Sequence, residues 1–164
     1  MGRRQTFVDG YNVIHRSPDL ARLAGRSLEL ARNALINRLN ASRALQQDDV
    51  TVVFDGAKGG QGYQTAERQG RVRVVYSRLG ETADEVIKRS VAAATGEVRV
   101  ITNDRELRDH ATALGGTPVR VGVRRPRPEP RIPDDEEPES RPGKKGPAHR
   151  PKKRRGPGEP YWTP

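Results

Sequence analysis

Four aspartates stand at or just beyond the carboxyl ends of short apolar runs, where they could share a metal ion. Asp9 and Asp55 each close such a run directly, and Asp104 follows another within a few residues. Asp84 lies just inside the helix expected after the run 71–76. The ligand crevice of an open α/β sheet lies outside the carboxyl ends of its strands. Parallel strands would therefore bring all four carboxylates to one rim of the sheet.

A cluster of four carboxylates has a defined chemistry. Packed anions raise one another's pKa and repel, so the cluster is costly unless a cation holds it together. Oxygen ligands favour Mg²⁺ or Mn²⁺ over zinc. The sequence therefore predicts that Asp9, Asp55, Asp84 and Asp104 bind Mg²⁺ or Mn²⁺ and are the catalytic residues.

Three further polar residues are predicted to support this site, and each has a structural alternative. Asn12 could offer its amide to metal or phosphate, although the preceding Asp9-Gly10 is also a strong turn dipeptide. Glu81 could assist Asp84, but acids are common near helix starts because the helix dipole favours them. Asn103 could equally cap a helix that begins at Asp104.

The segment 56–70 holds five glycines and no apolar period, which predicts a mobile loop. It lacks the Gly-Lys-Ser/Thr ending of a phosphate-binding P-loop. A glycine-rich flap that approaches the phosphates of an RNA strand fits the composition better. The predicted RNA-binding residues, within this loop and beyond it, are Lys58, Tyr63, Arg68, Lys88 and Arg105.

Alternating strand and helix patterns predict an α/β fold with a mostly parallel sheet of about five strands. The expected strands are short runs rich in Val and Ile, as in sheets covered on both faces: 5–9, 50–55, 71–76, 97–102 and 117–123. The expected helices are 27–47, with Ser27 as N-cap, 82–95, with a capping box formed by Thr82 and Glu85, and 104–114.

Composition divides the chain into a domain, 1–123, and a tail, 124–164. The tail holds 11 of the 13 prolines and almost no aliphatic residues, so it is predicted to be disordered. The net charge of +10 indicates a polyanionic partner, with nucleic acid the commonest, although solubility alone is the alternative reading. Without cysteines or a span-length apolar stretch, the chain is expected to be cytoplasmic, with no membrane partner.

A ribonuclease that uses paired histidines remains an alternative to metal catalysis. Such an enzyme needs two imidazoles on opposite sides of the phosphate. The sequence has three scattered histidines, of which His15 and His110 lie within the domain. The number of converging acids favours the metal route.

The segments Val8-Asp9-Gly10-Tyr11-Asn12, Val53-Phe54-Asp55-Gly56, Glu81-Thr82-Ala83-Asp84 and Thr102-Asn103-Asp104-Arg105 together resemble the YacP-like NYN domain family of PIN-like nucleases. The resemblance covers roughly 5–123. It implies a three-layer α/β/α sandwich and metal-dependent RNA cleavage, with the four aspartates and Asn12 at the family's motif positions. The family includes an endoribonuclease that acts on mRNA at the ribosome during translation.

Metal catalysis of this kind activates a bound water and stabilises the leaving oxygen, so the cut is expected to leave a 5′-phosphate. Two other functions remain open. One is a non-catalytic RNA- or ribosome-binding adaptor of the same fold, and the other is a phosphatase that acts on small phosphates. The tail is predicted to raise affinity for RNA through its Lys/Arg run, 144–155, without supplying catalytic groups.

Overall fold

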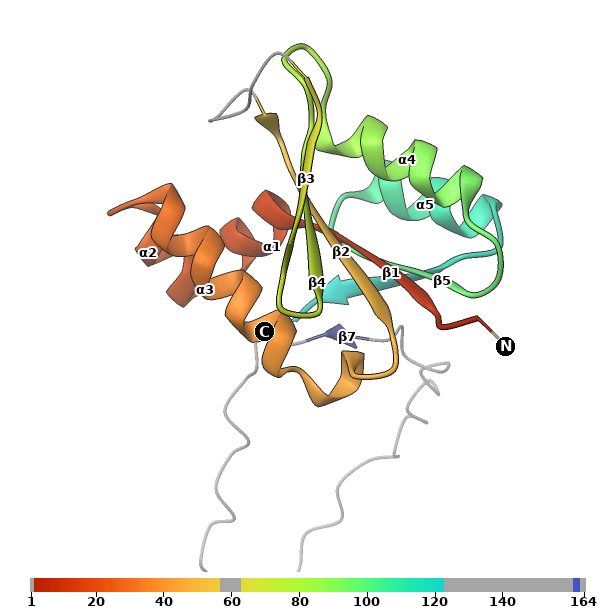
Figure 1. Ribbon diagram of the computed structural model, residues 1–164, viewed down its shortest axis with the longest axis horizontal. Helices are drawn as coiled ribbons and strands as arrows, with labels where there is room; N and C mark the ends of the chain where they lie inside the picture. Colours follow the sequence, from red (N-terminus) through yellow and green to blue (C-terminus); the bar gives the residue numbers. More distant parts are fainter. Residues whose placement is uncertain (1, 57–62, 123–160, 163–164) are drawn as a thin grey trace, which may run out of the picture. The chain divides into compact units, whose positions relative to one another are not determined.

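A mostly parallel sheet with helices on both faces forms the body of the protein (Figure 1). The computed structural model describes residues 2–56, 63–122 and 161–162. The strand order is β3-β4-β2-β1-β5-β6-β7, and each neighbouring pair is parallel except β3 with β4. The strands are β1 (Gln5–Asp9), β2 (Asp49–Phe54), β3 (Thr65–Gln69), β4 (Val72–Tyr76), β5 (Val98–Ile101), β6 (Thr117–Val121) and β7 (Tyr161–Trp162).

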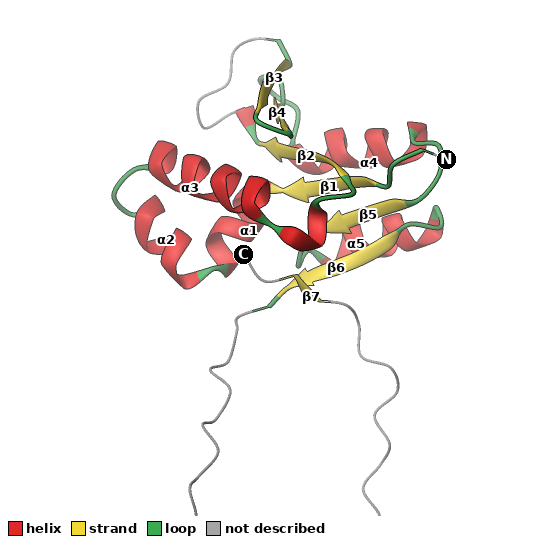
Figure 2. Ribbon diagram, turned by 60° about the horizontal axis from the view of Figure 1, so that its bottom comes forward, coloured by secondary structure: helices red, strands yellow, loops and turns green. Residues whose placement is uncertain are grey.

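The helices divide between the two faces of the sheet (Figure 2). Helices α1 (Gly10–Arg16), α2 (Pro18–Ala24) and α3 (Leu28–Ala41) cover one face, followed by the short 3-10 helix η1 (Arg43–Leu45). Helices α4 (Ala83–Ala93) and α5 (Arg105–Ala113) cover the other. The buried side chains accordingly form two clusters, one under each helical layer. The predicted three-layer α/β fold is confirmed.

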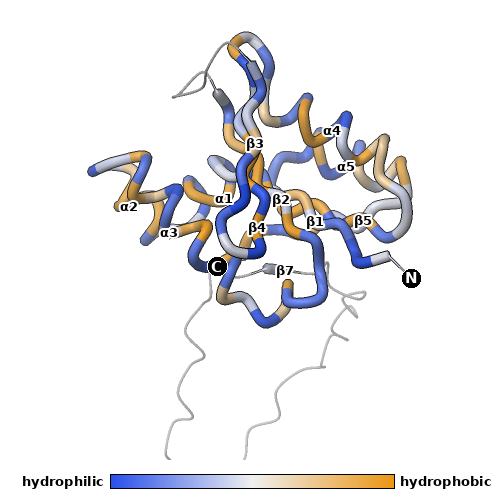
Figure 3. Tube along the Cα trace, viewed as in Figure 1, coloured by the Kyte–Doolittle hydropathy of each residue, from blue (hydrophilic) through white to orange (hydrophobic). Residues whose placement is uncertain are grey.

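Apolar runs form the central strands because both faces of the sheet are covered. In β2, the buried Val50, Val52 and Phe54 belong to the cluster beneath α1–α3, and the buried Val53 belongs to the other cluster. Figure 3 shows hydrophobic residues, in orange, along β1 and β2. The five predicted strands and the predicted helices 82–95 and 104–114 are present, with ends that differ by a few residues, whereas the predicted helix 27–47 stops at Ala41 and is followed by η1.

Three elements of the body lie outside those predictions. Asp9-Gly10 begins α1 rather than a turn, and Ser17-Pro18 begins α2 with proline in its first turn. The expected loop 56–70 contains β3, an edge strand whose mostly exposed side chains lack an apolar period. That expectation was therefore wrong for β3, while 57–62 lie outside the described residues.

Two residues that composition assigned to the tail belong to the sheet. Tyr161 and Trp162 form β7, which pairs with the carboxyl half of β6. Trp162 is buried in the cluster beneath α1–α3, and its indole Nε1 donates to Ser42 Oγ at 3.5 Å. These two residues therefore belong to the domain and not to the tail that composition predicted. The burial of one large aromatic side chain, that of Trp162, stabilises this short strand. Residues 124–160 lie outside the described part of the chain.

None of the helices in the described ranges has the length and apolar character that crossing a bilayer requires.

Candidate active site

Asp9, Asp55 and Asp84 line one cavity of about 320 Å³ at the carboxyl end of the parallel strands. They come from the end of β1, the residue after β2 and the first turn of α4. The side chains that complete the lining are Tyr11, Asn12, His15, Thr82 and Ala83. The structure thus gathers three of the four predicted aspartates. Asp104 does not line the cavity, but its charge is close enough to act on Asp9.

Asp9 is held in place by one hydrogen bond to each carboxylate oxygen. Its Oδ1 accepts the backbone N–H of Asn12 at 3.3 Å, which caps α1, and its Oδ2 accepts the hydroxyl of Thr102 at 3.3 Å. Burial raises the pKa of Asp9 to about 6, with smaller contributions from the charges of Asp84 and Asp104. These two hydrogen bonds favour the ionised form but do not offset the burial.

The glycines after Asp9 and Asp55 are required by close packing rather than by a turn. A Cβ on Gly10 would lie 2.3 Å from the ring of Phe54, and one on Gly56 would lie 1.8 Å from the carbonyl oxygen of Ser77. Ser77 Oγ also accepts from Gly56 N at 2.9 Å and donates to Glu81 O at 2.6 Å. This buried hydroxyl therefore ties the loop that carries Asp55 to the loop that leads into α4.

Asp84 divides its two oxygens between different environments. Its Oδ2 pairs with Lys88 Nζ at 2.7 Å, and the same ammonium pairs with Glu106 at the start of α5. Its Oδ1 is buried and has no hydrogen-bond partner within the described residues. Hydrogen bonding to Asp84 and Glu106 raises the pKa of Lys88, which therefore remains charged. Lys88 is thus the cation that partly neutralises the cavity lined by Asp9, Asp55 and Asp84, here named the acid cavity.

Replacing Lys88 with Gln should strengthen the binding of Mn²⁺ several-fold and lower the melting temperature of the metal-free protein. The change removes the cation that competes for Asp84 and leaves two carboxylates unpaired. Calorimetric titration with Mn²⁺ and thermal melts in chelator would measure both effects. Arg105→Gln is the matched control, because it removes the same charge from the start of α5, where Arg105 pairs with the exposed Asp109. Mn²⁺ affinity equal in the two variants would contradict this role of Lys88.

The residues after β5 connect neighbouring elements beside the cavity through hydrogen bonds. Asp104, not Asn103, caps α5, because its Oδ1 accepts Leu107 N at 3.0 Å. Asn103 instead exchanges two hydrogen bonds with the backbone of Val121, and its N–H donates to Asn12 Oδ1 at 2.8 Å. The structural alternative for Asn103, a helix cap, is therefore wrong, because the helix begins one residue later. Asn12 and Asn103 thus join the ends of β1, β5 and β6.

Thr102 was missed by the sequence reading. It is fully buried, donates to Asp9 Oδ2, and accepts the N–H of Asp104 at 3.0 Å. Its position two residues before a candidate ligand is the only signal that the sequence carries for it. One hydroxyl thereby links two of the four aspartates.

Glu81 is oriented by arginines. Its carboxylate is 7% exposed and pairs with Arg89 and, at 3.6 Å, with Arg78. Arg89 also donates to Gln64 at 2.9 Å, so this group ties α4 to the segment before β3. Glu81 does not line the acid cavity.

The predicted RNA-binding residues are spread over the molecule. Tyr63 is exposed and precedes the end of β3 that pairs with Tyr76 at the carboxyl end of β4. Arg68 lies at the opposite end of this antiparallel pair, 3.9 Å from Asp49 at the start of β2. Arg105 is exposed in the first turn of α5, while Lys88 is occupied as described. Lys58 lies outside the described residues.

The two histidines of the domain do not share a cavity. His15 is exposed and lines the acid cavity, with its ring centroid 6.5 Å from that of Tyr11. His110 lies near the end of α5, and its Nε2 is buried. A paired-histidine mechanism therefore loses its geometric basis in the described structure.

The donor set of the cavity fits a hard cation. All three acids offer carboxylate oxygens, and Asp84 Oδ1 lacks a hydrogen-bond partner in the described structure while Oδ2 keeps Lys88. No three Asp, Glu, His or Cys side chains within the described ranges are arranged to hold a metal ion as they stand. Asp9, Asp55 and Asp84 are nevertheless the residues that would hold Mg²⁺ or Mn²⁺, because both ions prefer oxygen ligands.

Comparison with known proteins places these features in a family. The family model of the YacP-like NYN domain matches residues 6–121. The Bacillus subtilis protein described as uncharacterized protein YacP is 35% identical over 101 residues, which cover 60% of this chain and 59% of that protein. The crystal structure of Rae1 (YacP) from Bacillus subtilis matches with a TM-score of 0.58 and 30% identity, covering 73% of this chain and 69% of that one. The structure of a mutant of the same protein matches with a TM-score of 0.59 and 28% identity, covering 71% and 68%.

Proposed function

Because the chain belongs to the YacP-like NYN domain family, we propose that it is a metal-dependent endoribonuclease whose active site is the acid cavity. NYN domains have a nuclease-type fold and an RNA-related function, which supports the class of reaction. The observation that carries the proposal is the convergence of Asp9, Asp55 and Asp84, from three separate elements, on one cavity. Mg²⁺ or Mn²⁺ bound there would polarise the phosphodiester and lower the pKa of a bound water.

The protein's own contribution is to hold these acids in place before RNA arrives. Asp9 is fixed through Asn12 N and Thr102, and Asp55 is fixed through the packing of Gly56 on Ser77. Asp84 is held by Lys88, whose charge also limits the repulsion among the carboxylates. Preorganised groups of this kind cost little reorganisation during the reaction.

The remaining lining supplies surfaces for the nucleotide. Tyr11 is packed edge-on against Phe54, and its hydroxyl accepts from Arg32 at 3.0 Å, so its position is fixed. His15 lies at the exposed side of the cavity, where it can contact the RNA strand. The net charge of +10 would draw the polyanion toward the molecule.

The direct test is metal-dependent cleavage of a mixed RNA pool by the full-length chain. We expect cuts in Mg²⁺ or Mn²⁺, none in chelator, and new ends that carry a 5′-phosphate and can be ligated without prior phosphorylation. A parallel reaction on mRNA engaged by translating ribosomes would test whether cleavage depends on translation.

Asp9→Asn protein, purified in the same way, controls for contaminating ribonucleases. Cleavage of equal extent by this variant, or cleavage unaffected by chelator, would refute the proposal. Binding of RNA without any cleavage would favour the non-catalytic adaptor. Turnover of small phosphate esters with no action on RNA would favour the phosphatase. The proposed contribution of residues 124–160 is RNA affinity, and deleting the Lys/Arg run 144–155 while keeping Tyr161 and Trp162 would test it by a weaker salt dependence of binding.

A further inference from the structure

A second cavity at the carboxyl end of the sheet is lined by three arginines. It measures about 320 Å³, and its described lining consists of Arg16, Asn103, Arg108, Arg120 and Val121. The three guanidinium groups come from the end of α1, from α5 and from β6. No acidic residue is among the described residues of this lining. Three distant parts of the chain thus deliver positive charge to one place.

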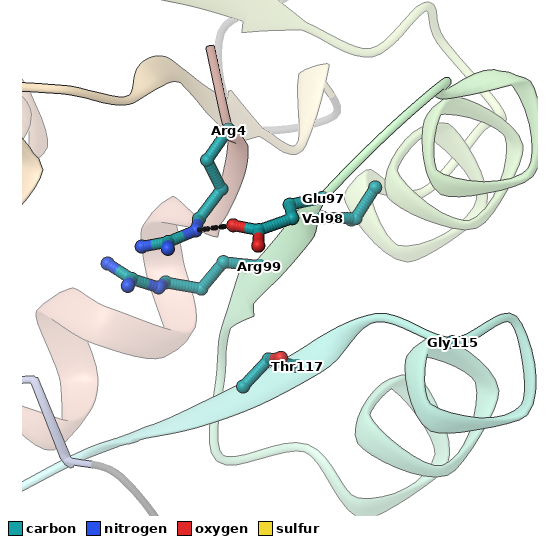
Figure 4. Close-up of a pocket in the computed structure, with 6 residues that line it drawn as sticks. All are labelled: Arg4, Glu97, Val98, Arg99, Gly115 and Thr117. Carbon is teal, nitrogen blue, oxygen red and sulfur yellow. Dashed lines mark hydrogen bonds and ion pairs between the residues drawn. The ribbon is translucent and has the colours of Figure 1, made fainter. Parts of the chain in front are cut away.

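A cavity at the opposite end of the sheet shows that arginines alone do not make such a site. It measures about 370 Å³ and includes Arg4 and Arg99 (Figure 4). Arg4 Nε pairs with Glu97 at 2.8 Å, and Arg99 pairs with the buried Asp48 at 3.1 Å. The acids there balance the cations. The described lining of the three-arginine cavity contains no acid, and Arg108 and Arg120 make further interactions within the chain.

The arginine cavity and the acid cavity are neighbours joined by one hydrogen bond. Asn12 lines the acid cavity and Asn103 lines the arginine cavity, and Asn103 N donates to Asn12 Oδ1 at 2.8 Å. The side chain of Asn103 is fixed by its two hydrogen bonds to Val121. A strand with one phosphate in the acid cavity would therefore pass close to the arginines.

We propose that Arg16, Arg108 and Arg120 bind a phosphate of the RNA strand next to the one that is cleaved. This inference rests on the proposed function for the identity of the ligand. The guanidinium group matches phosphate oxygens in a bidentate manner and stays charged at all relevant pH values. It carries five N–H donors, so a phosphate can add to or compete with the interactions that Arg108 and Arg120 already make within the chain.

The site would align the RNA rather than take part in bond cleavage. An anchored flanking phosphate fixes the register of the strand, while the acids act on its neighbour. Loss of such an anchor weakens binding of substrate and transition state alike, so it raises KM with little effect on kcat.

The test compares RNA binding by Arg16→Gln, Arg120→Gln and a matched control, each in the full-length chain carrying Asp9→Asn. Arg26→Gln is the control, because it removes the same charge from the exposed segment between α2 and α3. We expect each cavity variant to weaken binding of a labelled single-stranded RNA about tenfold, and the salt dependence of log K to become shallower by about 0.7. Arg26→Gln should change neither value by a comparable amount.

A scan with oligonucleotides that each carry one uncharged methylphosphonate linkage would locate the contact. One linkage beside the cleavage position should weaken binding in the reference protein and in Arg26→Gln, but not in Arg120→Gln. Thermal melts would show whether Arg120→Gln, at a partly buried position, still folds stably. Arg16 is exposed, so Arg16→Gln tests the same site without disturbing the core. Affinities and salt slopes of Arg16→Gln and Arg120→Gln equal to those of Arg26→Gln would overturn the phosphate site.

The two proposals fail in different ways. A wild-type chain that shows this binding pattern but cuts no RNA would refute the nuclease and leave the phosphate site in place. Metal-dependent cleavage with unchanged KM in Arg16→Gln and Arg120→Gln would support the nuclease and refute the phosphate site.

Discussion

Replacing Asp9 with Asn should reduce RNA cleavage roughly a thousandfold, because metal stabilisation of the phosphate is worth several kcal/mol and about 1.4 kcal/mol corresponds to a factor of ten. The asparagine keeps the shape of the side chain and an oxygen for the N–H of Asn12. Single-turnover cleavage at saturating RNA would measure the loss. Asp49→Asn, at the opposite end of β2, is the control and should retain activity. Cleavage of Asp9→Asn within tenfold of wild type would contradict the assignment.

The same variant should be more stable than the wild type at neutral pH when metal is absent. The pKa of Asp9 is about 6 in the folded protein and ordinarily 3.8, so the folded state binds more protons between these values. Wild-type stability therefore falls as pH rises from about 4 to about 6. The variant escapes this loss, which amounts to about 1–3 kcal/mol. Urea unfolding in chelator should show the gain at pH 7 and none below about pH 4.

Gly56→Ala is expected to be the most destabilising change near the site, with a loss of about 3 kcal/mol or more. The new Cβ would lie 1.8 Å from the carbonyl oxygen and 2.9 Å from the carbonyl carbon of Ser77, which are backbone atoms and cannot rotate away. The forced separation would also displace Asp55 and reduce cleavage. Urea unfolding and single-turnover kinetics would measure the two effects.

Gly25→Ala is the matched control for that substitution. Gly25 has a helical φ of −64°, and a Cβ there would meet its nearest atom, Arg22 O, at 3.5 Å. Its stability should be unchanged or slightly raised, since alanine restricts the unfolded chain more than glycine does. A Gly56→Ala protein that unfolds at the same urea concentration as Gly25→Ala would show that the contact with Ser77 is not needed.

The amino-acid sequence by itself determined the five inner strands of the sheet and the end of the sheet at which Asp9 and Asp55 lie. Runs such as 50–55 have one stable environment, a strand covered on both faces, and alternation with helices makes the strands parallel. The residues that follow parallel strands must then lie at one rim, as Asp9 and Asp55 do. The capping box of α4 could also be predicted from the sequence, because Thr82 and Glu85 interact within a single helical turn.

Tertiary structure alone decided which polar side chains meet across different elements. Lys88 pairs with Asp84 at i,i+4 spacing within α4, but it meets Glu106 only because α4 packs beside α5, and no spacing in the sequence encodes that second contact. The edge strand β3 has no apolar period, so only its ladder with β4 defines it. Trp162 pairs with β6 and donates to Ser42, a residue far from it in the sequence, so local sequence could not predict its burial. The three-arginine cavity likewise exists only because the ends of α1 and β6 meet the first half of α5, since contacts between distant segments depend on packing and not on local pattern.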